Sequence, residues 1–254
     1  ECESYLMFFD VPSYDEIIIE GVVSVFESGD EIDCFGELTG NIDLTVTGGS
    51  GVYTYDWSNG ETTEDIFNLG AGTYSVLVTD DAGCLDSALF VLNEPDSLVV
   101  SASYEDLLCF GDENGCIDVV VSGGSPPYTY EWSNGEDTPE ICGLSAGVYT
   151  IDVIDINLCV SSVSVEIQQP DELILTETIS VGSCGANISC AGADDAYIYI
   201  ETSGGTPDYT YFWLVDLDGD GVYDEDIFSE NDSIFDLAPG FYSIFVEDNN
   251  FCTD

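Results

Sequence analysis

The chain has 254 residues, of which 52 are Asp or Glu and none is Lys, Arg or His, so its formal net charge at pH 7 is −52. This charge excludes nucleic acid and anionic lipid surfaces as direct partners, because both contacts need basic side chains. Hydrophobic residues make up 44% of the chain, which predicts folded domains, although no apolar stretch is long enough for insertion into a membrane.

The acidic side chains have no basic side chain with which to form a salt bridge. We therefore expect them on solvated faces or around bound cations, and we expect salt and divalent ions to reduce their mutual repulsion. The same composition disfavours catalysis, because Ser and Cys nucleophiles lack the His or Lys that usually activates them. The chain is predicted not to be an enzyme.

One block of residues occurs three times along the chain. Each copy has a Cys, a Gly-Gly pair fourteen residues later, a Tyr-Thr-Tyr-x-Trp segment, a Leu-x-x-Gly-x-Tyr segment and a closing Cys. The Gly pairs are Gly48-Gly49, Gly123-Gly124 and Gly204-Gly205. The first two copies are 75 residues apart, which is the length of a small domain and exceeds that of a solenoid unit. The sequence thus predicts an array of similar domains.

The predicted elements are short strands. In chain order, residues 74–78, 128–132, 149–153 and 242–246 alternate between two sets of side chains, as half-buried strands do. The Leu-x-x-Gly-x-Tyr segments resemble the tyrosine corner of immunoglobulin-like domains. We predict an all-β fold of tandem immunoglobulin-like antiparallel β-sandwich domains. Their Tyr and Trp could instead form a sugar-binding platform, but a role in the core is favoured.

Short linkers containing Pro95 and Pro170 separate the copies, and they predict a semi-rigid, extended rod. The copies at both ends look interrupted, so we expect the chain to be a window on a longer array. The predicted boundaries are 1–12 for the tail of a preceding repeat, 13–94 for repeat 1, 95–169 for repeat 2 and 170–254 for repeat 3.

Ten cysteines in small domains indicate disulfides and an oxidising, extracellular compartment. Metal–thiolate sites are the alternative, but the chain has neither a Cys-x-x-Cys pair nor a His. Recurrence predicts a staple within each repeat, with a further pair in the second. The predicted disulfides are Cys34–Cys84, Cys109–Cys159, Cys190–Cys252 and Cys116–Cys142, while Cys2 and Cys184 have no assigned partner.

Residues 109–159 carry the pattern Cys … Gly-Gly-x-x-Pro-Tyr-x-Tyr-x-Trp-Ser-Asn-Gly … Leu-x-Ala-Gly-x-Tyr-x-Val-x-Val-x-Asp-x-x-x-Cys with few departures, and residues 34–84 follow it with Gly51-Val52 in place of the usual Pro. This pattern resembles the SprB-type repeat of giant gliding-motility adhesins exported by the type IX secretion system. The resemblance implies a filamentous protein outside the cell, on a bacterial cell surface, with no enzymatic role.

The third repeat departs from the pattern after Trp213, where a longer loop contains Asp216-Leu217-Asp218-Gly219-Asp220-Gly221-Val222-Tyr223-Asp224. Alternate Asp side chains and a backbone carbonyl can converge on one Ca²⁺, and Gly221 permits the turn. The predicted ligands are Asp216, Asp218, Asp220, Val222 and Asp224. The alternative is an acidic solvated loop without a metal.

Three Asp-Ser sites followed by a small or aliphatic residue resemble the O-glycosylation signal of the same bacterial group, at Ser87, Ser97 and Ser233. Because Asp is abundant, chance matches are the alternative.

The predicted function is a structural stalk segment of a large secreted adhesin or extracellular filament that mediates adhesion, gliding or attachment to prey and surfaces. Its expected partners are further copies of the repeat in a longer chain, other chains in a homo-oligomeric fibre, and surface glycans. The alternative function is an array of calcium-dependent, lectin-like polysaccharide-binding modules.

Overall fold

The computed structural model of the chain describes residues 15–181, 186–188, 193–217, 221–222, 225–229 and 231–254. Within them the structure consists of eighteen strands with antiparallel pairing and no helix, which confirms the all-β prediction. Accordingly, no helix suited to crossing a membrane occurs in these ranges.

The strands belong to the three repeats in order. Repeat 1 contains β1 (Asp15–Val23), β2 (Gly40–Gly49), β3 (Tyr53–Trp57), β4 (Ile66–Leu69), β5 (Gly72–Asp80) and β6 (Leu85–Leu92). Repeat 2 contains β7 (Val99–Tyr104), β8 (Gly115–Ser122), β9 (Thr129–Trp132), β10 (Glu140–Leu144), β11 (Gly147–Ile154) and β12 (Val160–Ile167). Repeat 3 contains β13 (Ile174–Ile179), β14 (Ala196–Ser203), β15 (Thr210–Asp216), β16 (Glu225–Ser229), β17 (Ser233–Leu237) and β18 (Phe241–Glu247).

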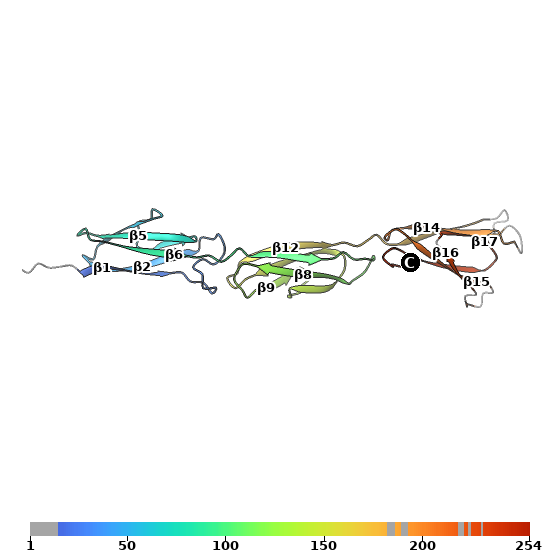
Figure 1. The fold of residues 1–254 in the computed structure, drawn as a ribbon, viewed down its shortest axis with the longest axis horizontal. Helices are drawn as coiled ribbons and strands as arrows, with labels where there is room; N and C mark the ends of the chain where they lie inside the picture. Colours follow the sequence, from blue (N-terminus) through green and yellow to red (C-terminus); the bar gives the residue numbers. More distant parts are fainter. Residues whose placement is uncertain (1–14, 182–185, 189–192, 218–220, 223–224, 230) are drawn as a thin grey trace, which may run out of the picture. The chain divides into compact units, whose positions relative to one another are not determined.

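The pairing order is that of an immunoglobulin-like sandwich. In repeat 1 the orders β1-β2-β4 and β3-β5-β6 correspond to strands A-B-E and C-F-G of an immunoglobulin domain without strand D. Repeat 2 has the same orders, β7-β8-β10 and β9-β11-β12. Figure 1 shows the two layers of repeat 1, drawn in blue to green.

The described residues divide into two compact units, and the division runs through repeat 2. One unit lies within Glu1–Ser101, Val120–Asp137 and Ile151–Val163, and the other within Ala102–Val119, Thr138–Thr150 and Ser164–Asp254. The first unit holds both sheets of repeat 1 and the pairing of β9 with β11. The second holds both sheets of repeat 3 and the pairing of β8 with β10.

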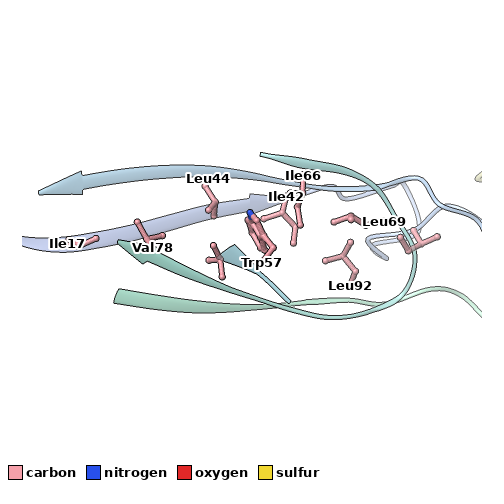
Figure 2. Packing of buried hydrophobic residues seen from close by; sticks show 10 residues of the cluster. Ile17, Ile42, Leu44, Trp57, Ile66, Leu69, Val78 and Leu92 are labelled. Carbon is pink, nitrogen blue, oxygen red and sulfur yellow. The ribbon is translucent and has the colours of Figure 1, made fainter. Parts of the chain in front are cut away.

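Each repeat buries the Trp of its third strand. In repeat 1 Trp57 is 2% exposed and lies between the two sheets, surrounded by aliphatic side chains from both (Figure 2). Its indole nitrogen donates to the backbone oxygen of Thr63 at 2.9 Å. Trp132 and Trp213 are buried as well. These aromatic rings therefore belong to the core, and the sugar-platform alternative fails for them.

The insertion in repeat 3 adds strand β16 to the sheet of β15 and β18. It forms a hairpin, because Val215 of β15 lies opposite Glu225 of β16, and residues 216–224 connect them. The arrangement corresponds to the extra C′ strand of variable-type immunoglobulin domains. The indole nitrogen of Trp213 has no hydrogen-bond partner among the described residues.

The Gly-Gly pairs are needed because two chain segments approach each other closely. The first Gly of each pair has a positive φ, and a Cβ there would overlap a carbonyl oxygen of the neighbouring segment; the three clashes are Gly48 with Glu16, Gly123 with Ser97 and Gly204 with Glu172. The oxygen of this Gly also accepts a hydrogen bond from a Tyr hydroxyl, as between Tyr128 and Gly123 at 2.7 Å. The same bond joins Tyr53 to Gly48 and Tyr209 to Gly204.

Three tyrosine corners close the crossovers that precede β5, β11 and β18. The hydroxyl of Tyr74 donates to the oxygen of Gly70 at 3.0 Å. Tyr149 and Tyr242 make the same bond to residues four positions earlier, Ser145 and Ala238, at 2.9 Å each. The Leu-x-x-Gly-x-Tyr segments thus have the structure that their resemblance to the corner predicts.

Replacing the corner tyrosine tests its contribution to stability. Tyr74→Phe removes one partly buried hydrogen bond and leaves the ring in place, so it is expected to lower the free energy of unfolding by about 1 kcal/mol, or several degrees in Tm. Thermal unfolding followed by circular dichroism measures the change. Tyr104→Phe, at an exposed ring, is the control. Equal effects of the two substitutions would contradict the role of the corner.

Candidate functional site at the junctions between repeats

The closing Cys of each repeat ends a turn that is organised by a buried Asp. In repeat 2 the Asp155 carboxylate accepts from the backbone nitrogens of Asn157, Cys159 and Ser125 at 2.9, 3.0 and 2.9 Å. Asp80 of repeat 1 accepts from Cys84 and Ser50, at 2.7 and 3.0 Å. The turn therefore has a fixed position beside the Gly-Gly end of its sandwich.

Repeat 3 has the same turn, which contains Asp248 and closes at Cys252. The Asp248 carboxylate accepts from the backbone nitrogens of Asn250, Cys252 and Thr206 at 2.8, 2.9 and 2.7 Å. All three Asp residues are buried, at 3–4% exposure, which corrects the expectation that the acids lie on solvated faces or around cations. Backbone N–H groups satisfy these carboxylates where basic side chains are absent.

The hydrogen bonds set the pKa of two of these carboxyls. Burial raises the pKa of Asp80, but donation from the backbone of Cys84 and Ser50 lowers it by more, so that it ends below the ordinary Asp value. The pKa of Asp248 is lowered in the same way, because donation from Thr206, Cys252 and Asn250 outweighs desolvation. Both groups therefore remain ionised in mildly acidic solution.

In repeats 1 and 2 the opening Cys lies in a loop at the other end of the sandwich, where the linker to the next repeat starts. In repeat 1 the backbone nitrogen of Ile32 donates to the oxygen of Asn93 at 3.0 Å. The nitrogen of Gly36 donates to the carboxylate of Glu94, immediately before Pro95, at 2.6 Å. These bonds hold the opening loop against the start of the linker.

Repeat 2 repeats the arrangement at its own linker. The nitrogen of Leu107 donates to the oxygen of Gln168 at 2.8 Å, and that of Gly111 to the Gln169 side chain at 2.9 Å. The opening loops of Cys34 and Cys109 are thus held at the end of their own repeat from which the linker leads to the next repeat.

The two kinds of loop are joined by disulfides between successive repeats. Cys34 is bonded to Cys159, with a Cα–Cα distance of 5.8 Å. Cys109 is bonded to Cys252, with a Cα–Cα distance of 5.6 Å. The opening Cys of one repeat is therefore cross-linked to the closing Cys of the repeat that follows it, and each disulfide connects the two sides of a linker.

The predicted pairs Cys34–Cys84 and Cys109–Cys159 are therefore wrong. Cys34 lies near the start of β2 and Cys84 near its end, and a strand of ten residues is about 30 Å long. A disulfide requires Cα atoms about 4.4–6.8 Å apart. The eight residues of β8 separate Cys109 from the closing turn of its repeat in the same way. The length of the sandwich therefore excludes a disulfide between the opening and the closing Cys of repeat 1 or repeat 2.

The remaining cysteines differ in their state. Cys116 and Cys142, a pair expected from the sequence, are bonded across the neighbouring strands β8 and β10, with a Cα–Cα distance of 4.1 Å. Cys84 is exposed and is the single described cysteine without a disulfide. Cys2, Cys184 and Cys190 lie outside the described residues. The predicted pair Cys190–Cys252 is nevertheless wrong, because Cys252 is bonded to Cys109.

An Asn side chain in the closing turn docks repeat 2 and repeat 3 onto the repeat before it. The side-chain amide of Asn157 donates to the backbone oxygen of Asp33 at 2.8 Å and to the Ser28 hydroxyl at 3.0 Å. The Asn250 amide donates to the backbone oxygen of Leu108 at 3.1 Å. Sequence reasoning missed this contact, although the recurring Asp-x-Asn-x-Cys was its signal; repeat 1 has Ala82 at the same position.

The predicted calcium ligands fall largely outside the described part of the chain. Asp218, Asp220 and Asp224 are not among the described residues, and Val222 is exposed. Asp216 is buried at 6% exposure, and its carboxylate accepts from the backbone nitrogen of Gly221 at 3.0 Å. Elsewhere in the described ranges, no three acidic or cysteine side chains gather as a metal site. The last residue of β15 and the segment that connects it to β16 thus carry all five predicted ligands.

The three predicted O-glycosylation serines do not lie together. Ser87 is exposed in the middle of β6, and Ser97 is exposed in the linker that follows Pro95. Ser233 is half-buried at the start of β17. The first two are accessible to a modifying enzyme, and the use of all three stays a prediction.

The lowered pKa of Asp80 predicts a pH-dependent contribution to stability. Because the folded-state pKa lies below the unfolded value of about 3.9, the stabilisation is fully present above that value and is lost as the pH falls below it. Asp80→Asn is expected to lower Tm by several degrees at pH 7, and the difference from the unsubstituted chain should shrink below about pH 4. Asp81→Asn, at an exposed neighbour, is the control. A difference that is constant from pH 7 to pH 2 would contradict this role of Asp80.

Comparison with solved structures finds only distant similarities. The N-terminal eight immunoglobulin domains of Down Syndrome Cell Adhesion Molecule isoform 1.30.30 are 12% identical over 84% of this chain and 32% of that one, with a TM-score of 0.33. Salmonella alpha-2-macroglobulin reacted with methylamine is 8% identical over 95% of this chain and 23% of that one, with a TM-score of 0.23. The chain thus spans about a third or less of these two. Such values carry no argument about function, and the fold rests on the strand pairing.

Among curated proteins, no sequence matches the chain. The family model of the SprB repeat matches three segments, residues 30–62, 101–137 and 186–215. Each match includes the opening Cys, the Gly-Gly pair and the buried Trp of one repeat. The chain therefore contains three segments of the SprB-repeat type, one in each repeat.

Proposed function

We propose that the chain is a stalk segment of a large secreted cell-surface adhesin or extracellular filament of a bacterium. The SprB repeat supports a structural role of the adhesin type at the cell surface. The observation that carries the proposal is the cross-linking of successive repeats at both described junctions. A protein that transmits tension along its length benefits from covalent bonds across its linkers.

The two junction disulfides overlap along the chain, and this limits how far the chain extends under force. The first encloses 125 residues and the second 143, and both contain the segment from Cys109 to Cys159. The shortest covalent path from Cys34 to Cys252 therefore crosses the first disulfide to Cys159, runs back along the chain to Cys109 and crosses the second disulfide. The Cys116–Cys142 disulfide reduces the stretch between Cys159 and Cys109 from 50 residues to 24, which are 17 from 159 to 142 and 7 from 116 to 109. Without disulfides the path follows the chain and has 218 residues.

The further parts of the proposal concern partners and export. Further copies of the repeat in a longer chain would extend the stalk, and lateral association would give a homo-oligomeric fibre. In such a fibre, contacts between copies would use apolar surface, bridging cations or glycans, since no Lys or Arg is present for salt bridges. Gliding and type IX export follow from the family resemblance, and a stalk role requires no catalysis.

Single-molecule stretching tests the stalk. With all repeats unfolded, the segment from Cys34 to Cys252 should reach roughly 100 Å when oxidised and roughly 740 Å after reduction, at about 3.4 Å per residue and about 5.5 Å per disulfide. The Cys116→Ser/Cys142→Ser variant should lengthen the oxidised segment to roughly 180 Å, because the path between Cys159 and Cys109 then has 50 residues. An oxidised chain that extends as far as the reduced one would contradict the proposal.

A second candidate function is calcium-dependent binding of polysaccharides by repeat 3. The favouring observation is the β15–β16 hairpin, whose connecting residues 216–224 contain four Asp and are absent from the other repeats. Oxygen ligands of this kind suit Ca²⁺, which would order the loop and present it to a glycan. Asp216, Asp218, Asp220 and Asp224 would contribute carboxylates and Val222 a backbone oxygen.

Calcium binding is tested by calorimetry and by thermal unfolding. Ca²⁺ at 100 times its Kd should stabilise repeat 3 by about 2.7 kcal/mol, and Asp218→Asn/Asp220→Asn should abolish the effect. Asp236→Asn, which removes an exposed charge elsewhere in repeat 3, should leave it intact. Chelator-sensitive binding to a glycan array would favour this second function. An unchanged Tm with saturating Ca²⁺ would reject the site.

A further inference from the structure

We propose that Cys84 is a covalent attachment site for the opening loop of another copy of the repeat. Cys84 is exposed and lacks a disulfide. The residues at the same position in the next two repeats, Cys159 and Cys252, are both bonded to an opening-loop cysteine. Two of the three closing cysteines thus form a disulfide with the opening-loop cysteine of another repeat.

The turn that carries Cys84 has the structure of the two occupied ones. The backbone nitrogen of Cys84 donates to Asp80 at 2.7 Å, as those of Cys159 and Cys252 donate to their Asp residues at 3.0 and 2.9 Å. The residue before each closing Cys has a positive φ, 86° at Gly83, 69° at Leu158 and 65° at Phe251. Repeat 1 therefore presents its thiol on the same scaffold, ready for the same partner.

The opening loops within the described chain are already in use, since Cys34 and Cys109 are bonded to other closing cysteines. The ligand of Cys84 is accordingly an opening loop from a further copy of the repeat. In such a loop the backbone oxygen of the residue before the Cys faces the closing turn, as the oxygens of Asp33 and Leu108 do at the two junctions. Attachment depends on this junction geometry and is independent of the adhesive role proposed above.

Repeat 1 lacks the Asn side chain that docks the opening loop at the other two junctions, so a substitution at this position can change the strength of the attachment. Asn157 and Asn250 donate to the backbone oxygen that precedes the opening Cys, whereas repeat 1 has Ala82 at that position. Docking at Cys84 consequently lacks one hydrogen bond that the other junctions have. Ala82→Asn should restore it and strengthen the attachment.

The bond forms by thiol–disulfide exchange with a small-molecule disulfide such as oxidised glutathione. The Cys84 thiolate attacks the oxidised glutathione, forms a mixed disulfide and releases one glutathione thiolate. The opening-loop thiolate then attacks the Cys84 sulfur and releases the second. One oxidised glutathione is reduced to two glutathione molecules for each protein disulfide formed.

The test uses two variants of the whole chain, both with Cys2→Ser and Cys184→Ser. One also carries Cys190→Ser and keeps Cys84, while the other carries Cys84→Ser and keeps Cys190, which occupies the opening position in the sequence of repeat 3. They are mixed in a glutathione redox buffer, separated without reduction and mapped by mass spectrometry. Circular dichroism checks that both variants are folded.

Random pairing of the two thiols would give heterodimer and the two homodimers in a ratio of about 2:1:1. We expect the Cys84–Cys190 heterodimer to exceed that ratio by about tenfold, and Ala82→Asn to increase it further. A random ratio, no heterodimer, or a Cys84 that carries only glutathione would each overturn the proposal.

Discussion

The length of the β-sandwich decides which cysteines can meet. In repeats 1 and 2 the opening and closing cysteines lie at opposite ends of the domain, separated by a strand of eight to ten residues. Each can therefore reach only the facing end of a neighbouring repeat. From this constraint follow the disulfides across the linkers, the overlap of the two enclosed segments and the unused thiol at Cys84. In antibody domains, by contrast, the disulfide joins the two sheets of one sandwich.

The absence of basic side chains is the second constraint, and the fold meets it with backbone N–H groups. Asp80, Asp155 and Asp248 each accept at least two backbone hydrogen bonds while buried. Asp65, in a loop, similarly accepts from the backbone nitrogen of Leu44 at 2.9 Å. Such bonds favour the ionised carboxylate without a counter-charge. A polyanion can thereby place acids at positions where most proteins would need a salt bridge.

The sequence was sufficient to predict the elements that local patterns determine. Alternation predicted the strands, the Leu-x-x-Gly-x-Tyr segments predicted the corner at Tyr74, and recurrence predicted three similar units. The disulfide pairing could not be predicted in this way, because recurrence is equally consistent with bonds within repeats and between them. Strand length, together with the position of each Cys at a strand end, would have distinguished the two. The recurring Asp-x-Asn-x-Cys marks Asn157 as a special position, but its docking role depends on a neighbouring repeat and could not be read from the motif alone.

Disulfide mapping tests the central claim most directly. Because the chain has no Lys or Arg, trypsin does not cut it; a protease that cuts at Asp and Glu cleaves it without reduction, and the linked peptides are then identified by mass spectrometry. The account predicts peptides that join Cys34 to Cys159 and Cys109 to Cys252. Peptides that join Cys34 to Cys84 and Cys109 to Cys159 would contradict it.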